Sequence, residues 1–149
     1  MAEPSSHPEV RDREGRGTVL ETVFRQVQPT GPRIPLPARL DYDATRPYEV
    51  TLRLVPPGGP AVRWVLSREL LRAGTRARCG LGDVRLAPVP GPGRGGLVLL
   101  RLGPPEADAV FCADRAELAD WLARTERVVP PGEESGRVDW DALITRLLR

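Results

Sequence analysis

Apolar and polar residues alternate along much of the first two thirds of the chain, a pattern typical of β-strands with one buried face. The alternation is clearest after Tyr48, where Val50, Leu52 and Leu54 share one face and Thr51 the other. Runs of this kind, or runs rich in β-branched residues, predict further strands at residues 18–27, 38–42, 61–66, 83–89, 97–102 and 109–112. Proline- and glycine-rich turns between these runs favour antiparallel pairing.

Helical spacing replaces this alternation in three places. Ser67 can cap a short helix at residues 68–73, with Gly74 as its left-handed stop. Asp114 and Glu117 form a capping-box-like start for a helix to about residue 127, and a last helix follows Asp139. Strands with one inserted helix and two C-terminal helices predict an α+β fold of antiparallel sheets.

The first 17 residues carry no periodicity and many charges. We expect residues 1–17 to form a disordered N-terminal tail and residues 18–149 to form a single domain. Pro35 and Pro37 lack main-chain donors, so a strand that contains them is expected at a sheet edge or at the entrance to a strand.

Two tyrosines flank a predicted turn at residues 43–47. Asp43 favours side-chain to backbone bonds, and Pro47 excludes helical geometry at the residue before it. If the flanking strands pair, Tyr42 and Tyr48 lie opposite each other and hold the hairpin closed. Base stacking on the two rings is the alternative, although a chain with 5% aromatic residues is poor in stacking surfaces.

The residue inventory is unfavourable for catalysis. All 22 basic residues are arginine, so the chain offers no lysine nucleophile or phosphate-binding lysine. The single histidine, His7, lies in the expected tail, which leaves no histidine triad or histidine metal site in the folded part. We therefore predict no enzyme activity, no cofactor and no metal. The GxGxxG match at residues 91–96 precedes a strand instead of a helix and is interpreted as a hairpin loop.

The remaining composition indicates the cellular compartment. No apolar run is long enough to span a membrane, and the N-terminus lacks the apolar core of a secretory signal. Cys79 and Cys112 have no CxxC companion, which favours free thiols in a reducing cytoplasm over a disulfide.

An arginine cluster provides the candidate interaction patch. It consists of Arg68, Arg72, Arg76 and Arg78, with Arg85 nearby and only Glu69 and Asp83 to oppose it. Three interpretations stay open: a solvated face, the arginine-rich rim of a protein interface, and a surface for nucleic-acid phosphates.

An ordered series of motifs makes the chain resemble the SsgA-like proteins, the sporulation and cell-division regulators of filamentous actinomycetes. The series consists of Tyr42-Asp43, Pro47-Tyr48, Trp64-Val65, Arg68, Leu70-Leu71, Gly74, Gly82-Asp83-Val84-Arg85 and Val129-Pro130-Pro131-Gly132, within about residues 18–148. Two features depart from the pattern: the segment before Thr18 is longer, and Leu86-Ala87 stands where relatives often place a tryptophan.

The resemblance implies a non-enzymatic cytoplasmic regulator that acts at the division septum through protein contacts. The expected partners are the tubulin-like division ring, the cell-wall remodelling machinery or related family members, and the chain itself as a homotrimer. The motif residues are expected to be mainly structural. The implied fold is similar to that of the whirly single-stranded nucleic-acid binders, so nucleic-acid binding is kept as the alternative function.

Overall fold

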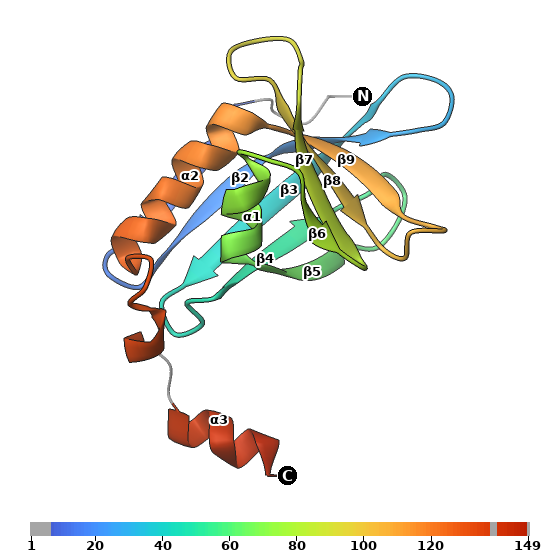
Figure 1. Cartoon of the computed structure of the whole chain (residues 1–149). Coiled ribbons are helices and arrows are strands. Elements are labelled where there is room, and N and C mark those ends of the chain that lie inside the picture. Colours follow the sequence, from blue (N-terminus) through green and yellow to red (C-terminus); the bar gives the residue numbers. More distant parts are fainter. Residues whose placement is uncertain (1–6, 138–139, 149) are drawn as a thin grey trace.

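A computed structural model describes residues 7–137 and 140–148 of the chain (Figure 1). Within these residues the chain forms nine strands, three α-helices and one 3-10 helix. The strands are β1 (Glu9–Arg13), β2 (Gly17–Val27), β3 (Ile34–Asp43), β4 (Glu49–Leu54), β5 (Val62–Ser67), β6 (Cys79–Leu81), β7 (Val84–Val89), β8 (Leu97–Leu102) and β9 (Ala109–Asp114). The helices are α1 (Arg68–Gly74), α2 (Arg115–Val128) and α3 (Trp140–Leu147), and the 3-10 helix is η1 (Glu134–Arg137). This order confirms the predicted α+β fold.

All strands pair antiparallel in one curled sheet of order β5-β4-β3-β2-β9-β8-β7-β6. The long strand β2 pairs with β3 along one edge, while its other edge is shared between β1 at residues 17–21 and β9 at residues 25–27. The sheet therefore has two halves joined at β2, and α1 and α2 lie against it (Figure 1).

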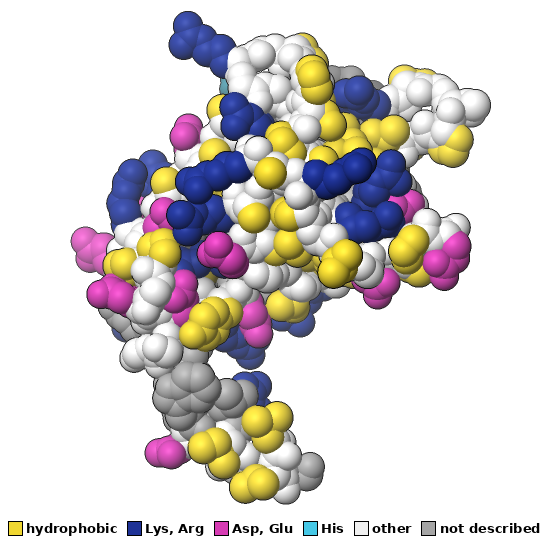
Figure 2. Space-filling view, in the orientation of Figure 1, with side chains coloured by type: hydrophobic (Ala, Val, Ile, Leu, Met, Phe, Trp, Pro, Cys, Tyr) yellow, Lys and Arg dark blue, Asp and Glu magenta, His cyan; other side chains and the backbone are white. Residues whose placement is uncertain are grey.

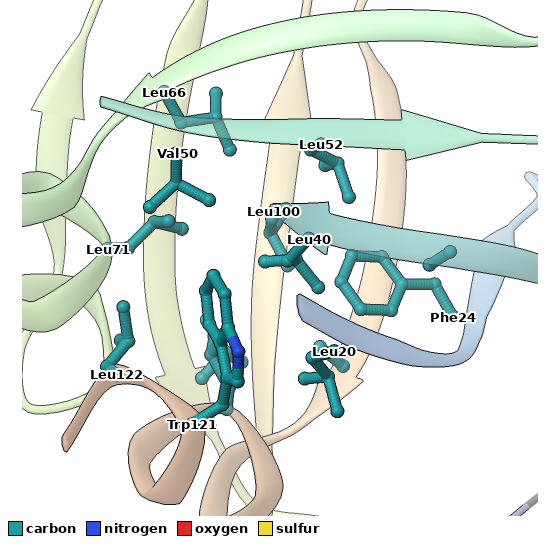
Figure 3. Packing of buried hydrophobic residues seen from close by; sticks show 14 of the residues in the cluster. Leu20, Phe24, Leu40, Val50, Leu52, Leu66, Leu71, Leu100, Trp121 and Leu122 are labelled. Atoms are coloured by element: carbon teal, nitrogen blue, oxygen red, sulfur yellow. The ribbon is translucent and has the colours of Figure 1, made fainter. Parts of the chain in front are cut away.

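The core lies between the two halves of the sheet and the helices α1 and α2. Figure 3 shows Trp121 of α2 pointing toward side chains from α1 and from strands of both halves. The largest fully buried side chains are Trp121, Tyr42, Phe24, Leu20, Leu36, Leu40, Leu52, Leu54, Leu66, Leu71, Leu100 and Leu118. Most predicted apolar stripes contribute to this set, whereas the predicted strands at residues 83–89 and 109–112 contribute none.

Two of the three predicted helix starts are confirmed. The Ser67 hydroxyl accepts a hydrogen bond from the Leu70 N–H, and the Asp114 carboxylate accepts one from the Glu117 N–H. The predicted stripe of α2, which comprises Leu118, Trp121, Leu122 and Thr125, is buried. The predicted cap Asp139 lies outside the described residues.

Residues 9–17 overturn part of the expected N-terminal tail. Strand β1 pairs with β2, and Arg11 forms a 2.8 Å ion pair with Glu21. Asp12 accepts a 2.7 Å bond from Arg124 of α2. The prediction was wrong here because main-chain pairing and charged side chains hold this strand, and these leave no apolar periodicity in the sequence.

The strand β3 contains Pro35 and Pro37 but lies inside the sheet, not at its edge. The neighbouring β4 pairs only with residues 38–41, so the proline half of β3 has a sheet partner on one side only. Proline has no main-chain N–H to donate to a neighbouring strand. Because β4 does not extend beside Pro35 and Pro37, no strand on that side requires this donor, and the prolines are tolerated inside the sheet.

Gly74 ends α1 in a different way from the one predicted. Its φ is not positive, and Thr75 caps the helix in right-handed geometry with its N–H directed to the Arg72 and Leu71 carbonyls. A Cβ at Gly74 would lie 2.6 Å from the Cβ of Leu86 on β7. The glycine is required by close helix–sheet packing rather than by backbone geometry.

Candidate interaction surface

Arg68, the first residue of α1, belongs to the interior and not to a surface patch. Its guanidinium donates to the carbonyl oxygens of Thr125 (3.1 Å) and Val129 (2.8 Å) at the end of α2. It also forms a 2.8 Å ion pair with Glu134 and lies 4.9 Å from the centre of the Tyr42 ring. A cation beside the carbonyl end of a helix is favourable. The expectation of an exposed Arg68 was therefore wrong: it joins α1, α2, β3 and the segment that leads to η1.

The predicted clasp between two tyrosines is also wrong. Tyr42 is fully buried and donates its hydroxyl to the Pro47 carbonyl at 2.9 Å, whereas Tyr48 is 50% exposed. The pairing of Asp41 with Thr51 places Tyr42 opposite residue 50 instead of Tyr48. Strand pairing and the bond from the Tyr42 hydroxyl to Pro47, not a pair of rings, close this hairpin.

Asp43 acts within that turn as predicted. The Thr45 N–H and hydroxyl donate to its carboxylate at 2.9 and 2.7 Å. The hydrogen bond from the Thr45 N–H is the main reason that the pKa of Asp43 is lowered. Asp43 is thus a turn residue whose Oδ1 accepts both bonds from Thr45.

The other motif residues lie toward the two opposite edges of the sheet. Trp64 on β5 packs against the core, and Gly82 with Asp83 forms the turn between β6 and β7. Gly82 has a φ of 69°, which glycine adopts without strain. Arg85 on β7 reaches Asp108 at 2.6 Å.

The remaining predicted patch residues lie on or after α1. Arg72 pairs with Glu126 of α2 at 3.2 Å and with Glu69 at 3.7 Å. Arg76 and Arg78 are exposed in the connection between α1 and β6. The structure therefore brings Arg76 and Arg78 to the surface beside β6, and it separates them from Arg68.

A surface that the sequence analysis missed lies next to Arg78. In β8, Val98, Leu100 and Leu102 are buried in the core, yet Leu97 and Leu99 on the opposite face are apolar too. Apolar residues on both faces are typical of strands that are covered on both sides. In the described residues β8 buries only one face completely, so its outer face is available for a partner.

This outer face forms a groove of about 450 Å³ across β6, β7 and β8, which we call the arginine-rimmed groove. Ala87, Val89 and Leu99 form its apolar floor, and Arg78, Arg85 and Arg101 stand around it. Figure 2 shows basic side chains on both sides of hydrophobic ones on the face of the molecule that carries α1, β6 and β7.

The groove is positively charged because three guanidinium groups face one carboxylate. Asp108 accepts from Arg85 at 2.6 Å and from Arg101 at 3.2 Å. Arg78 forms no ion pair with any described residue, and the buried Arg85 Nε has no hydrogen-bond partner among them. The groove therefore combines an apolar floor with cationic donors that are only partly satisfied.

Two cysteines lie among the described residues. Cys79 and Cys112 are free thiols, and burial raises the pKa of both. Among residues 7–137 and 140–148, no three His, Cys, Asp or Glu residues gather as metal ligands. No described helix has the length and apolar character needed to cross a membrane.

Comparison with known proteins identifies the family. The family model described as "Streptomyces sporulation and cell division protein, SsgA" matches residues 36–134. The chain belongs to the SsgA family. The matched range contains every motif on which the resemblance was based up to Gly132, as well as the arginine-rimmed groove.

Relatives within the SsgA family cover most of the chain. The sporulation-specific cell division protein SsgB of Kineococcus radiotolerans is 41% identical over 131 residues, which are 87% of this chain and 78% of the relative. SsgB of Salinispora tropica is 40% identical over 131 residues, 87% of this chain and 91% of the relative. A crystal structure of an SsgA-like sporulation-specific cell division protein from Thermobifida fusca superposes with a TM-score of 0.78 at 34% identity, over 91% of this chain and 98% of that one.

One feature of the sequence could have indicated the groove. The run Leu97–Leu102, LVLLRL, has almost no polar face, which contrasts with the alternating β4. Whether the second apolar face of β8 is covered or open depends on the elements around it, and these are decided by the order of strands in the sheet.

Proposed function

We propose that this chain is a non-enzymatic regulator of sporulation-specific cell division that acts by binding other proteins at the division septum. The observation that carries this proposal is the arginine-rimmed groove, which has the apolar centre and arginine-rich rim that protein interfaces favour. The chain belongs to the SsgA family, and its relatives are named sporulation-specific cell division proteins. This membership supports sporulation-specific cell division as the process in which the chain acts.

Proteins are favoured over nucleic acid as partners for two reasons. Of the arginines at and beside the groove, Arg72, Arg85 and Arg101 already pair with carboxylates. This leaves Arg76 and Arg78 to replace the counterions of a phosphate backbone there. Trp64 is partly buried against the core, and of Tyr42, Tyr48, Trp64 and Trp121 only Tyr48 is exposed. A single ring is a weak platform for base stacking.

The expected partners are the tubulin-like division-ring protein, the cell-wall remodelling machinery and further copies of the chain, which we propose to assemble as a trimer. The first test titrates labelled oligo(dT) and the purified division-ring protein at about 50 and about 200 mM salt. We expect protein binding that tolerates salt. For the oligonucleotide we expect a Kd no tighter than roughly 10⁻⁴–10⁻⁶ M.

Arg76→Glu together with Arg78→Glu should weaken the protein complex, because both side chains are exposed beside the groove. Arg63→Glu is the matched control, since Arg63 is exposed on the distant strand β5. Nanomolar oligonucleotide binding at the higher salt, lost in the double variant alone, would replace the protein-binding proposal with the nucleic-acid alternative.

Localisation gives a second test of the same proposal. A fluorescent fusion in the native host should form bands at sporulation septa, because a regulator of the division ring must be where the ring assembles. A uniform distribution throughout septation would contradict a septal role.

A further inference from the structure

We propose that α3 of one copy docks into the arginine-rimmed groove of a second copy, with Ile144, Leu147 and Leu148 on the groove floor. The inference rests on the proposed function in one respect, namely that this groove contacts protein. It adds which protein segment binds there and how copies of the chain are joined.

The helix α3 has an apolar face without cover. Ile144, Leu147 and Leu148 have the i, i+3, i+4 spacing of one helix face and are 51%, 75% and 82% exposed. Figure 1 places α3 apart from the sheet and α2. Isolated helices shorter than about 12–15 residues are marginal in water, and most of their stability in proteins comes from packing of the apolar face. An eight-residue helix of this kind needs a surface to pack on.

The groove is a surface that needs an occupant. Its floor of Ala87, Val89 and Leu99 lies on the side of β7 and β8 opposite to the buried Leu86 and Leu100. Its volume of about 450 Å³ is far larger than the share of one water, about 30 Å³, so it has room for side chains. The apolar face of α3 and the apolar floor of the groove are therefore complementary surfaces.

Charge supports the same pairing. The groove carries three arginines and one aspartate, whereas the first turn of α3 carries Asp141 and follows Asp139 in the sequence. The last turn of α3 carries Arg146, so only the start of the helix is acidic. Arg78 has no ion pair in the described part of the chain and lies at the rim. Docking of α3 brings these opposite charges together around an apolar centre, which favours one orientation of the helix.

The second copy, rather than the same chain, is favoured by the anchoring of the C-terminal segment. Arg68 holds the Val129 carbonyl and Glu134 at the start of α1, and η1 then leads away from the body (Figure 1). Helix and groove are different surfaces, so the contact is heterologous. Heterologous contacts close into rings when the rotation permits, and a closed ring leaves no groove empty.

The test uses the full chain with the two surfaces disabled separately. Leu147→Glu with Leu148→Glu removes the helix contact, and Leu99→Glu removes the groove contact. Each variant should be a monomer by light scattering, while Leu81→Glu, at a position 93% exposed in the β6–β7 hairpin, should keep the wild-type mass. Circular dichroism melts confirm that each variant is folded. Arg101→Glu is the substitute groove variant if Leu99→Glu unfolds.

Mixing the two disabled variants separates this proposal from all alternatives. The helix variant retains its groove and the groove variant retains its helix, so one contact can form and a 1:1 heterodimer should result. Fold-back of α3 onto its own groove predicts a monomer for the wild type at every concentration and no heterodimer, which would overturn the proposal. A wild-type mass that persists in the helix variant would also overturn it.

The same variants distinguish this inference from the proposed function. Loss of the oligomer with retained binding of a division protein supports α3 docking and places that partner elsewhere. An unchanged oligomer with lost binding of the division protein overturns α3 docking and leaves the groove as a site for the division protein.

Discussion

At the scale of single residues, Arg68 decides how the C-terminal part of the chain is held. Its side chain is buried, and its guanidinium is shared between two carbonyls and Glu134. Arg68→Met should lower the free energy of unfolding by about 3 kcal/mol, because it leaves two buried carbonyls and the partly buried Glu134 carboxylate without their donor. Urea denaturation measures this loss. Arg76→Met, at an exposed position, should change stability by no more than about 0.5 kcal/mol. Equal effects of the two changes would contradict the buried network.

Glu134 gives the same network a pH dependence. The hydrogen bond from its own main-chain N–H is the largest of the effects that lower the pKa of Glu134, and Arg68 adds to it. A carboxyl whose pKa is lower in the folded state stabilises the fold above its unfolded pKa, and this contribution disappears as pH falls through the folded pKa. The stability difference between wild type and Glu134→Gln should therefore be largest near about pH 7 and shrink toward about pH 3. Denaturation curves at several pH values measure it, with Glu133→Gln, in the exposed neighbour, as control. A difference that stays constant with pH would contradict the assignment.

At the scale of elements, close packing of α1 on β7 depends on a residue without a side chain. Gly74→Ala would place a Cβ 2.6 Å from the Cβ of Leu86, an atom fixed to the backbone of β7. Overpacking of this kind costs about 1–3 kcal/mol, and the better helix propensity of alanine offsets up to about 1 kcal/mol. We expect a net loss of about 1–2 kcal/mol in thermal or urea denaturation. Gly136→Ala, where a Cβ would meet nothing within 4 Å, should be nearly neutral. A neutral Gly74→Ala would show that α1 can shift away from β7.

At the scale of the whole molecule, the sheet has open edges at β5 and β6, and the outer face of β8 has no complete cover in the described residues. Open edges and apolar faces favour association. We predict a trimer, with a mass in solution about three times the 16.3 kDa of one chain. Light scattering after gel filtration measures this mass. A monomer at micromolar concentration would contradict the prediction.

The C-terminal segment connects the buried Arg68 with the helix α3 that we propose joins copies of the chain. Arg68 fixes residues near Val129 and Glu134, and α3 follows within a few residues. A change at Arg68 should therefore alter not only stability but also the position from which α3 is presented. Arg68→Met therefore tests stability and is not used to test binding in the groove.

The sequence by itself determined the elements that depend on local order. The strands β4, β7 and β8 and the start of α2 follow from alternation or from a capping box, because these signals arise between residues close in the chain. The turn at Asp43 was predicted for the same reason, since its hydrogen bonds span two residues. The absence of lysine and the scarcity of histidine, which argue against several catalytic mechanisms, are also properties of the sequence alone.

Tertiary structure decided what each predicted residue does. Arg68 and Arg76 look alike in the sequence, yet one is buried against carbonyls 57 and 61 residues away and the other is exposed. Tyr42 and Tyr48 look like a pair, but the strand register buries one and exposes the other. The strand β1 and the outer face of β8 depend on which strands become neighbours. Burial and charge environment are properties of contacts between segments distant in sequence, and no local pattern of residues encodes them.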